Sequence, residues 1–238
     1  MMPAIILCNP QMGENIGAAA RAMQNFGLDD LRIVNPRDGW PNERAVQMSS
    51  GAFNTMPAPQ VFEKLEDALA DLHFTFATTA RQRDMVKPVF IPESAALESR
   101  KKTGQKTGIL FGAERSGLLN EEIIMAQAII NIPTNPDFSS LNLGQSVLLM
   151  AYEWSKHPAH TEGVKQQEQI PAKQKDIQGF LSRLESDLEN NKFFRSTDLK
   201  PTMIRNIQNI FTRNNLTQQE VQTLHGILSA LRGNKGTK

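Results

Sequence analysis

Three polar segments of this sequence could carry chemistry, and each follows a short run of residues typical of a buried β-strand. The first, residues 9–21, reads Asn-Pro-Gln-Met-Gly-Glu-Asn-Ile-Gly-Ala-Ala-Ala-Arg, and the second, residues 111–118, reads Phe-Gly-Ala-Glu-Arg-Ser-Gly-Leu. The third, residues 132–143, contains Asn135, Ser139, Ser140 and Asn142. Open α/β sheets place their ligand sites at the carboxyl ends of strands, so the segments predict a shared site. Taken singly, each also fits a local role in helix capping or a turn.

The fingerprints of several common enzyme classes do not occur in the sequence. Neither the dinucleotide pattern G-x-G-x-x-G nor the phosphate loop G-x-x-x-x-G-K-[ST] is present. The patterns H-E-x-x-H and G-x-S-x-G and any cysteine pair are also missing. The four histidines are scattered, at His73, His157, His160 and His225. We therefore expect no metal site and no hydrolase of these types.

Strand-like runs alternate with helical patterns over the first 155 residues, which is typical of an α/β fold. Strands are expected at residues 4–8, 31–34, 74–79, 108–111 and 128–132. A first helix is expected to begin near Glu14 or Asn15, to bury Ile16, Ala20 and Met23, and to stop at Gly27. A second helix has Leu65, Ala68, Leu69 and Leu72 on one face, and a third covers residues 141–156.

The composition changes after residue 157. Residues 158–175 are rich in Gln, Lys and Pro, which predicts a linker between a domain at 1–157 and a second at 176–238. The second domain has three apolar stripes at helical spacing, at residues 177–188, 203–211 and 221–231. It is therefore expected to be a small three-helix unit, with helix starts near Asp198 and Thr217. Thr217 and Glu220 have the spacing of a capping box.

Charge is divided between these two parts. The whole chain carries a net charge of +1, but residues 165–238 hold 12 Lys and Arg against 7 Asp and Glu, and residues 1–164 hold 14 against 18. This asymmetry indicates that the tail meets an anionic partner.

Length and composition fit a globular protein of one large domain and an appendage. The chain has 238 residues, of which 39% are hydrophobic, and no apolar run approaches the roughly 20 residues needed to cross a bilayer. The N-terminus lacks a basic leader and reads as a first strand, so we expect a cytoplasmic protein without a signal peptide. The single cysteine, Cys8, is expected to be a small buried hydrophobic residue.

Taken together and in this order, the three polar segments resemble the motifs of the SpoU branch of the SPOUT class. The first motif is Asn15-x-Gly17-x-x-x-Arg21, the second is Phe111-Gly-x-Glu114-x-x-Gly117-Leu118, and the third runs from Ile132-Pro133 to Ser139-Ser140-Leu141-Asn142. The resemblance covers residues 3–156. It implies an RNA ribose 2′-O-methyltransferase that uses S-adenosylmethionine. It also implies a SPOUT-type parallel sheet with a C-terminal trefoil knot that forms the cofactor pocket, followed here by the small all-helical domain.

Within this branch, the third motif and the helical extension look most like the members that methylate tRNA in the anticodon loop, at position 32, on C or U. Two alternatives stay open. One is a ribosomal RNA methyltransferase of the same fold, and the other is an RNA-binding module without catalysis. The intact residues Asn15, Arg21, Glu114, Ser140 and Asn142 argue against the second alternative.

The resemblance also implies roles for individual residues. It places the cofactor against Thr78, Thr79, Ala80, Gly112, Ile132, Ser140, Leu141 and Asn142. Arg21 matches the catalytic arginine. Because a guanidinium stays protonated in proteins, we interpret its role as a clamp on the target phosphate and the developing alkoxide, in place of the base that is often assigned. Asn15 would orient Arg21 or the ribose, and Glu114 would pair with Arg21 or contact the substrate. Ser140 is expected to cap the last knot helix and to touch the cofactor.

Basic residues outside the motifs are candidates for contacts with RNA phosphates. Arg81 and Arg83 follow the Thr78–Ala80 loop, with ordinary surface charge as the alternative role. In the tail, the candidates are Lys192, Arg195, Lys200, Arg205 and Arg213.

A two-fold homodimer is the last expectation. The helix at 141–156 presents an apolar band that includes Val147 and Met150 and is too wide for one sheet face to cover. Family members pair through the knot helices and complete each active site with the second subunit. We therefore expect this helix and the first one, near Met23 and Phe26, to form the contact.

Overall fold

The computed structural model describes residues 1–80, 86–156 and 170–233. These residues contain one sheet of seven parallel strands in the order β3-β2-β1-β6-β4-β7-β5. The strands are β1 (Ala4–Cys8), β2 (Leu31–Val34), β3 (Gln60–Phe62), β4 (Phe74–Thr78), β5 (Val89–Phe90), β6 (Thr107–Phe111) and β7 (Ala128–Ile130). The α/β fold agrees with the sequence pattern, and the parallel sheet agrees with the resemblance.

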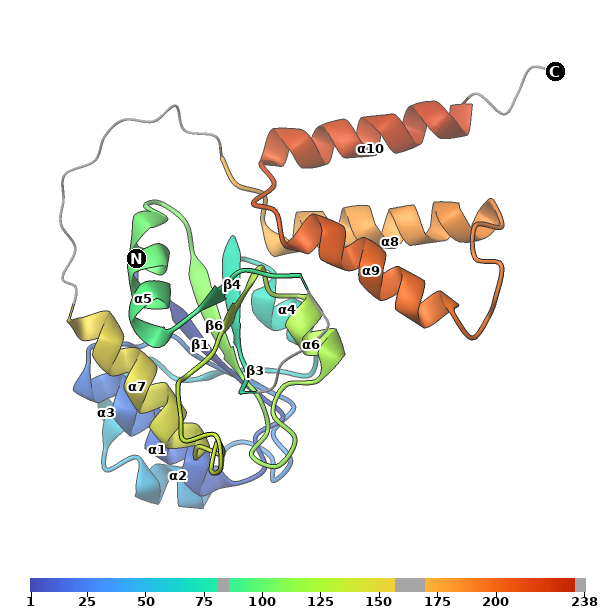
Figure 1. Cartoon of the computed structure of the whole chain (residues 1–238). Coiled ribbons are helices and arrows are strands. Elements are labelled where there is room, and N and C mark those ends of the chain that lie inside the picture. The colour runs from blue at the N-terminus through green and yellow to red at the C-terminus, as the bar shows by residue number, and fades with distance from the viewer. Residues whose placement is uncertain (81–85, 157–169, 234–238) are drawn as a thin grey trace.

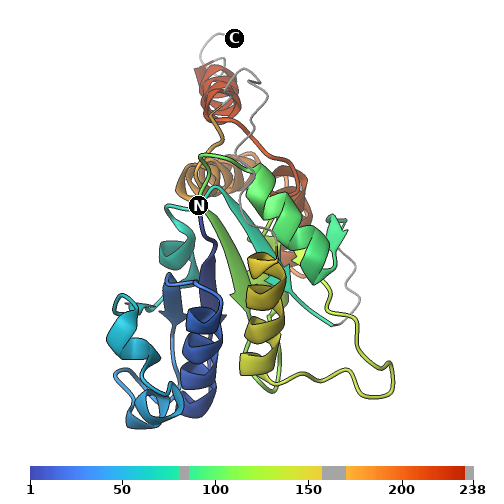
Figure 2. The ribbon, with the colours of Figure 1, turned by 90° about the vertical axis from the view of Figure 1, so that its left-hand side faces the viewer.

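Helices cover both faces of this sheet (Figures 1 and 2). One face is packed by α1 (Gly13–Asn25), α5 (Pro92–Lys101) and α7 (Leu143–Ser155), with α2 (Glu43–Met48) and α3 (Ala52–Thr55) lying against α1. The other face is packed by α4 (Leu65–Leu69) and α6 (Asn120–Ile124). Two layers of core result, which explains why central strands such as β1 and β6 are buried along their whole length.

Five strands match the sequence prediction, and two were missed. The bounds of β1 and β2 agree with it, and β4, β6 and β7 differ from it by one or two residues. The missed strands are β3 and β5, which have three and two residues and lie at the two edges of the sheet. Both are short and largely exposed, so neither carries the run of about four or more apolar residues by which a buried strand is recognised.

The tail forms three helices, as expected: α8 (Gln174–Asn190), α9 (Lys200–Thr212) and α10 (Gln218–Gly233). Their small core contains Ala172, Ile177, Phe180, Val221 and Leu228. The capping box before α10 is confirmed, because the backbone N–H of Glu220 donates to Thr217 Oγ1 at 3.1 Å and that of Thr217 donates to Glu220 Oε2 at 2.7 Å. The expected start at Asp198 is wrong. Helix α9 follows Leu199 and begins with Lys200-Pro201, since proline suits the first helical turn.

The buried amine of Lys87 joins the sheet domain to the tail. Its Nζ donates to the carbonyls of Ile124 at 3.1 Å and Ala126 at 2.6 Å, near the end of α6, and to Thr212 Oγ1 on α9 at 3.1 Å. Burial lowers the pKa of Lys87 to about 8. Nearby, a cavity of about 610 Å³ lies between α4 and α6 on one side and α8 and α9 on the other. The expected linker covers residues 158–175. Of these, 158–169 lie outside the described residues, and α8 begins at Gln174, inside the expected range.

The apolar band of α7 corrects one expectation. Val147 and Met150 are 0% and 1% exposed, because α1, α5 and the sheet cover them within one chain. Met23 is likewise fully buried. The exposed side of α7 instead carries Leu148, Leu149 and Tyr152, which are 38%, 38% and 47% exposed. Any partner on this helix would therefore meet these three residues.

None of the helices in the described residues has the length and apolar character that crossing a membrane requires.

Candidate functional site

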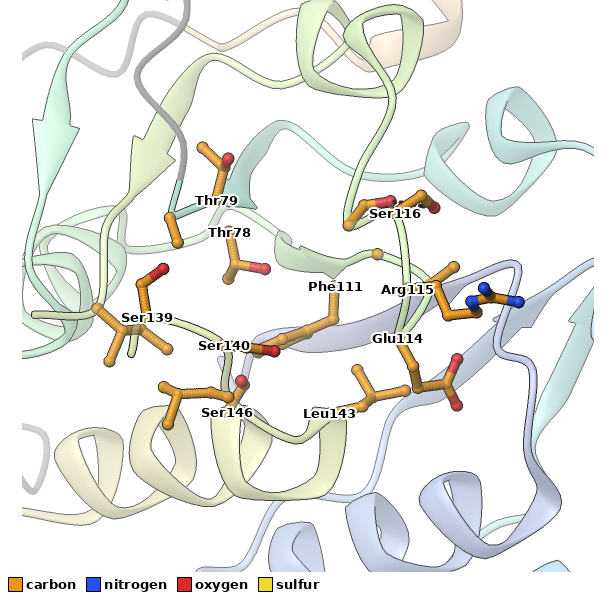
Figure 3. A pocket seen from close by; sticks show the side chains of 16 residues that line it. Thr78, Thr79, Phe111, Glu114, Arg115, Ser116, Ser139, Ser140, Leu143 and Ser146 are labelled. Atoms are coloured by element: carbon orange, nitrogen blue, oxygen red, sulfur yellow. Dashed lines mark hydrogen bonds between the residues drawn. The ribbon is translucent and has the colours of Figure 1, made fainter. Parts of the chain in front are cut away.

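A pocket lies where β4, β6 and β7 end, at the carboxyl edge of the sheet (Figure 3). Its volume is about 240 Å³. The walls come from the loops after these three strands and from the first turn of α7, which meet here although they are far apart in sequence. In Figure 3, Thr78 and Thr79 lie across the pocket from Ser139, Ser140 and Ser146. Two of the three polar segments therefore line this pocket directly.

Gly112 shapes the wall that follows β6. A Cβ atom on this residue would lie 2.1 Å from the carbonyl carbon of Gly117 and 2.1 Å from the nitrogen of Leu118. The loop folds back on Gly112 so closely because the N–H of Gly117 donates to the carbonyl of Ala113 at 2.8 Å and Gly117 adopts a left-handed φ of +67°. The space that a side chain would need at residue 112 is thus filled by backbone.

A carboxylate joins the three motifs beside the pocket. Glu114 Oε1 accepts hydrogen bonds from Asn15 Nδ2 at 2.7 Å and from the N–H of Met12 at 3.2 Å, and its Oε2 accepts from the N–H of Gln11 at 2.8 Å. Asn142 Nδ2 then donates to Asn15 Oδ1 at 2.8 Å. Asn15 is only 8% exposed, whereas Glu114 is half-buried and Asn142 is exposed, so the network runs from the protein interior to its surface. One residue from each motif takes part, and Glu114 fixes the loop after β1 against the loop after β6.

This network differs from two expected contacts. Asn15 was expected to orient Arg21 or the ribose, and Glu114 to pair with Arg21 or contact the substrate. In the structure Asn15 and Glu114 bind each other, because Asn15 lies on the inner side of α1. Arg21 is exposed on α1, does not line the pocket, and donates from Nη1 to Ser50 Oγ at 2.9 Å.

Ser140 lies at the pocket but does not cap α7. The capping residue is Asn142, whose Oδ1 accepts from the N–H of Gln145 at 3.3 Å. Ser140 is two residues too early for this contact, so the expected cap is wrong. Its place among the residues that line the pocket agrees with the expected position next to a cofactor.

Seven of the eight expected cofactor residues line the pocket, namely Thr78, Thr79, Ala80, Gly112, Ile132, Ser140 and Leu141. Asn142 stands behind them in the Asn15 network. Sequence reasoning missed lining residues such as Phe111, Arg115 and Ser146. Phe111 and Arg115 belong to the second motif, so their place in that motif was the available signal.

The expected RNA contacts are spread over the molecule. Arg81 and Arg83 lie outside the described residues. Lys192, Arg195 and Arg213 are exposed on the helical tail. Arg205 lies apart from them, because its guanidinium faces α6 and comes within 3.7 Å of Glu121 across the cavity between the two parts.

The chemistry of the pocket suits a nucleoside-like cofactor better than a metal ion. Apolar groups from Phe111, Ile132 and Leu143 stand beside the hydroxyl groups of Thr78 and Ser140, and backbone groups of two loops are close enough for direct contact. Among the described residues, no cluster of His, Cys, Asp and Glu could hold a metal ion.

Comparisons with known proteins agree with this geometry. The model of the SpoU rRNA Methylase family matches residues 2–152. The tRNA (cytidine/uridine-2′-O-)-methyltransferase TrmJ of Escherichia coli K12 is 32% identical over 98% of this chain and 97% of its own length. The crystal structure of TrmJ from Z. mobilis ZM4 is 45% identical and covers 98% of this chain and 100% of its own, with a TM-score of 0.90. The SpoU methyltransferase AviRb from Streptomyces viridochromogenes, solved with the cofactor AdoMet, shares the fold at 18% identity, with 65% of this chain and 60% of its own covered and a TM-score of 0.52.

Proposed function

We propose that this chain, which belongs to the SpoU rRNA Methylase family, transfers a methyl group from S-adenosylmethionine to a ribose 2′-oxygen of tRNA, on cytidine or uridine. The observation that carries the proposal is the meeting of all three motifs at one pocket edge, joined through Glu114. The expected target is position 32 of the anticodon loop. The protein would act in the cytoplasm, where tRNA is modified.

The tail favours tRNA over ribosomal RNA. The family model ends at residue 152 and has no bearing on the helices that follow. Relatives named for tRNA methylation, in contrast, match 98% of the chain and therefore include α8, α9 and α10. We assign residues 1–157 to methyl transfer, 158–175 to a linker and 176–238 to tRNA binding. The exposed cations Lys192, Arg195 and Arg213 would contact tRNA phosphates.

The pocket residues fit S-adenosylmethionine. Backbone groups of the loops at Thr78–Ala80 and Gly112 would hold the nucleoside, and Phe111, Ile132 and Leu143 would cover its apolar surface. When bound, the cofactor supplies a methyl group on a sulfonium, which is intrinsically reactive toward an oxygen nucleophile. The remaining task of the protein is to hold the 2′-OH in line with that methyl group, and such positioning is worth up to about 7–11 kcal/mol.

Arg21 would act on the RNA. Its guanidinium remains positively charged, so it can bind the phosphate next to the target ribose and stabilise negative charge as the 2′-oxygen loses its proton to solvent. Arg21 lies outside the pocket of its own chain, which supports a homodimer in which it serves the pocket of the second copy. The exposed residues Leu148, Leu149 and Tyr152 on α7, with Phe26 packed against Tyr152, would form the contact.

Incubation with labelled S-adenosylmethionine and separate pools of tRNA and ribosomal RNA, followed by mass spectrometry of the product, tests the function. We expect label on a tRNA ribose. Label on ribosomal RNA alone would favour a ribosomal RNA methyltransferase of the same fold. No methyl transfer together with tight RNA binding would favour an RNA-binding module without catalysis. Arg21→Ala should lower turnover by at least about 100-fold and leave the cofactor Kd unchanged, because the side chain acts on RNA.

The dimer is tested by sedimentation of Leu149→Glu/Tyr152→Glu. We expect a folded monomer without methyl transfer, since both side chains are exposed in one chain and tolerate charge there. A wild-type protein that is monomeric and fully active would contradict the shared site.

A further inference from the structure

One face of α1 is built so that α2 can approach it closely. This face carries Gly13, Gly17 and Arg21, which recur every four residues and so lie on successive turns. A Cβ on Gly13 would lie 2.1 Å from Asn42 Oδ1, and a Cβ on Gly17 would lie 2.2 Å from the carbonyl oxygen of Ala45. On this face, the first two turns of α1 carry no side chain because α2 and its N-cap residue occupy the space. Arg21 is the first residue on this face that has a side chain.

The turn between α2 and α3 meets Arg21 at this point. Ser49 packs into the core beneath the turn, and Ser50 and Gly51 both adopt left-handed backbone conformations, with φ of +50° and +87°. Left-handed φ is unfavourable for serine, which costs free energy that glycine or asparagine would largely avoid. The hydroxyl group of Ser50 accepts the hydrogen bond from Arg21 Nη1 at 2.9 Å. A strained conformation thus presents this hydroxyl group to the guanidinium.

We infer that Ser50 is a positioning residue for Arg21. This inference rests on the proposed role of Arg21 in methyl transfer. An exposed arginine has many rotamers, and each bound hydrogen-bond partner reduces the number it samples before substrate arrives. Because the partner is a neutral hydroxyl, it directs the guanidinium without cancelling its charge, as a carboxylate would. The motif spacing Asn15-x-Gly17-x-x-x-Arg21 then has a physical reason, since Gly17 lets the turn that carries Ser50 reach Arg21.

Three variants of Ser50 separate the hydroxyl from the backbone. Ser50→Ala removes the hydroxyl and keeps the unfavourable φ, Ser50→Gly removes both, and Ser50→Asn keeps an acceptor on a residue that tolerates left-handed φ. We expect kcat to fall about 3- to 10-fold in the Ala and Gly variants alike, which is the loss of one exposed hydrogen bond. The Asn variant should recover most of the wild-type kcat.

The melting temperature and the cofactor Kd, measured beside kcat, distinguish a positioning role of Ser50 from a purely structural one. If Ser50 acts only on the fold, Ser50→Gly should match or exceed wild type in both stability and kcat, because it relieves the strained φ. We expect instead that Ser50→Gly is more stable than Ser50→Ala, equally reduced in kcat, and unchanged in cofactor Kd.

Arg21→Ala distinguishes failure of this inference from failure of the proposed function. Wild-type kcat in Ser50→Gly beside an inactive Arg21→Ala overturns the role of Ser50 and leaves the function of Arg21 intact. Wild-type kcat in Arg21→Ala overturns the assignment of Arg21 itself.

Discussion

Substitution of Gly112 by alanine should impair the cofactor pocket. The added carbon would lie 2.1 Å from backbone atoms of Gly117 and Leu118, whereas ordinary contacts of a methyl group begin at 3.4 Å. These neighbours are main-chain atoms, so no side chain can rotate away to make room. The loop at 113–118 must retreat by more than about 1 Å, and it carries the wall of the pocket and Glu114 with it.

The size of the effect follows from this displacement. Overpacking of a closely packed site costs about 1–3 kcal/mol. Because 1.4 kcal/mol corresponds to a factor of ten in affinity, we expect a 5- to 100-fold increase in the Kd of S-adenosylmethionine, measured by isothermal titration calorimetry. The affinity for tRNA should change little, since the exposed cations proposed to bind tRNA lie on the helical tail and not on this loop.

Gly179→Ala in α8 is the matched control. A Cβ on Gly179 meets nothing within 4 Å, and alanine in a helix is more favourable than glycine by about 1 kcal/mol. This variant should therefore bind the cofactor like wild type and unfold at the same or a higher temperature. If Gly112→Ala bound the cofactor as tightly as Gly179→Ala does, the close loop at Gly112 would not form the binding surface.

Three further results are expected. Glu114→Gln should lower the free energy of unfolding by about 2–3 kcal/mol in denaturant titration, because one amide oxygen cannot replace a carboxylate that accepts three hydrogen bonds; an unchanged midpoint would mean that Glu114 does not hold the loops. Burial lowers the pKa of Lys87 to about 8 from 10.5, so between these pH values the unfolded chain binds more protons than the folded chain. The free energy of unfolding of wild type, relative to that of Lys87→Met, should therefore rise from pH 8 to pH 10.5. A difference that does not change with pH would contradict the burial of the amine. Replacement of the three exposed tail cations Lys192, Arg195 and Arg213 by glutamine should lower the slope of log K against log salt concentration for tRNA binding by about 2 to 3. An unchanged slope would show that these residues do not contact tRNA phosphates.

The sequence predicted the strands whose residues are all apolar and buried. The five residues of β1 are all apolar and all buried, and the pattern located this strand without error. The edge strands β3 and β5 have no such pattern, because their backbone pairing and not their side chains defines them. The start of α9 was misjudged for a similar reason, since Asp198 has the right residue type for a cap but Lys200-Pro201 begins the helix.

Contacts between motifs could not be predicted in detail. Asn15 and Glu114 are 99 residues apart, and Arg21 and Ser50 are 29 apart, so no local pattern joins them. The motifs indicated which residues gather at the edge of the sheet, but not which of them pair. The apolar band on α7 was wrongly taken as a dimer contact, because its width in the sequence does not show how many elements cover it. Helix α5 covers α7 in addition to α1 and the sheet, and the sequence pattern does not reveal this.

The first motif serves two different surfaces of α1. Asn15 and Arg21 are six residues apart, which at about 100° per residue turns Arg21 by about 240° from Asn15 around the helix axis. Asn15 therefore faces Glu114 and the pocket edge of its own chain, whereas Arg21 faces α2 and solvent. Arg21 therefore does not line the pocket beside which Asn15 lies. If Arg21 acts in methyl transfer, its orientation on α1 supports the proposed homodimer, in which Arg21 serves the pocket of the second copy, and Gly17 and Ser50 define the direction in which its side chain points.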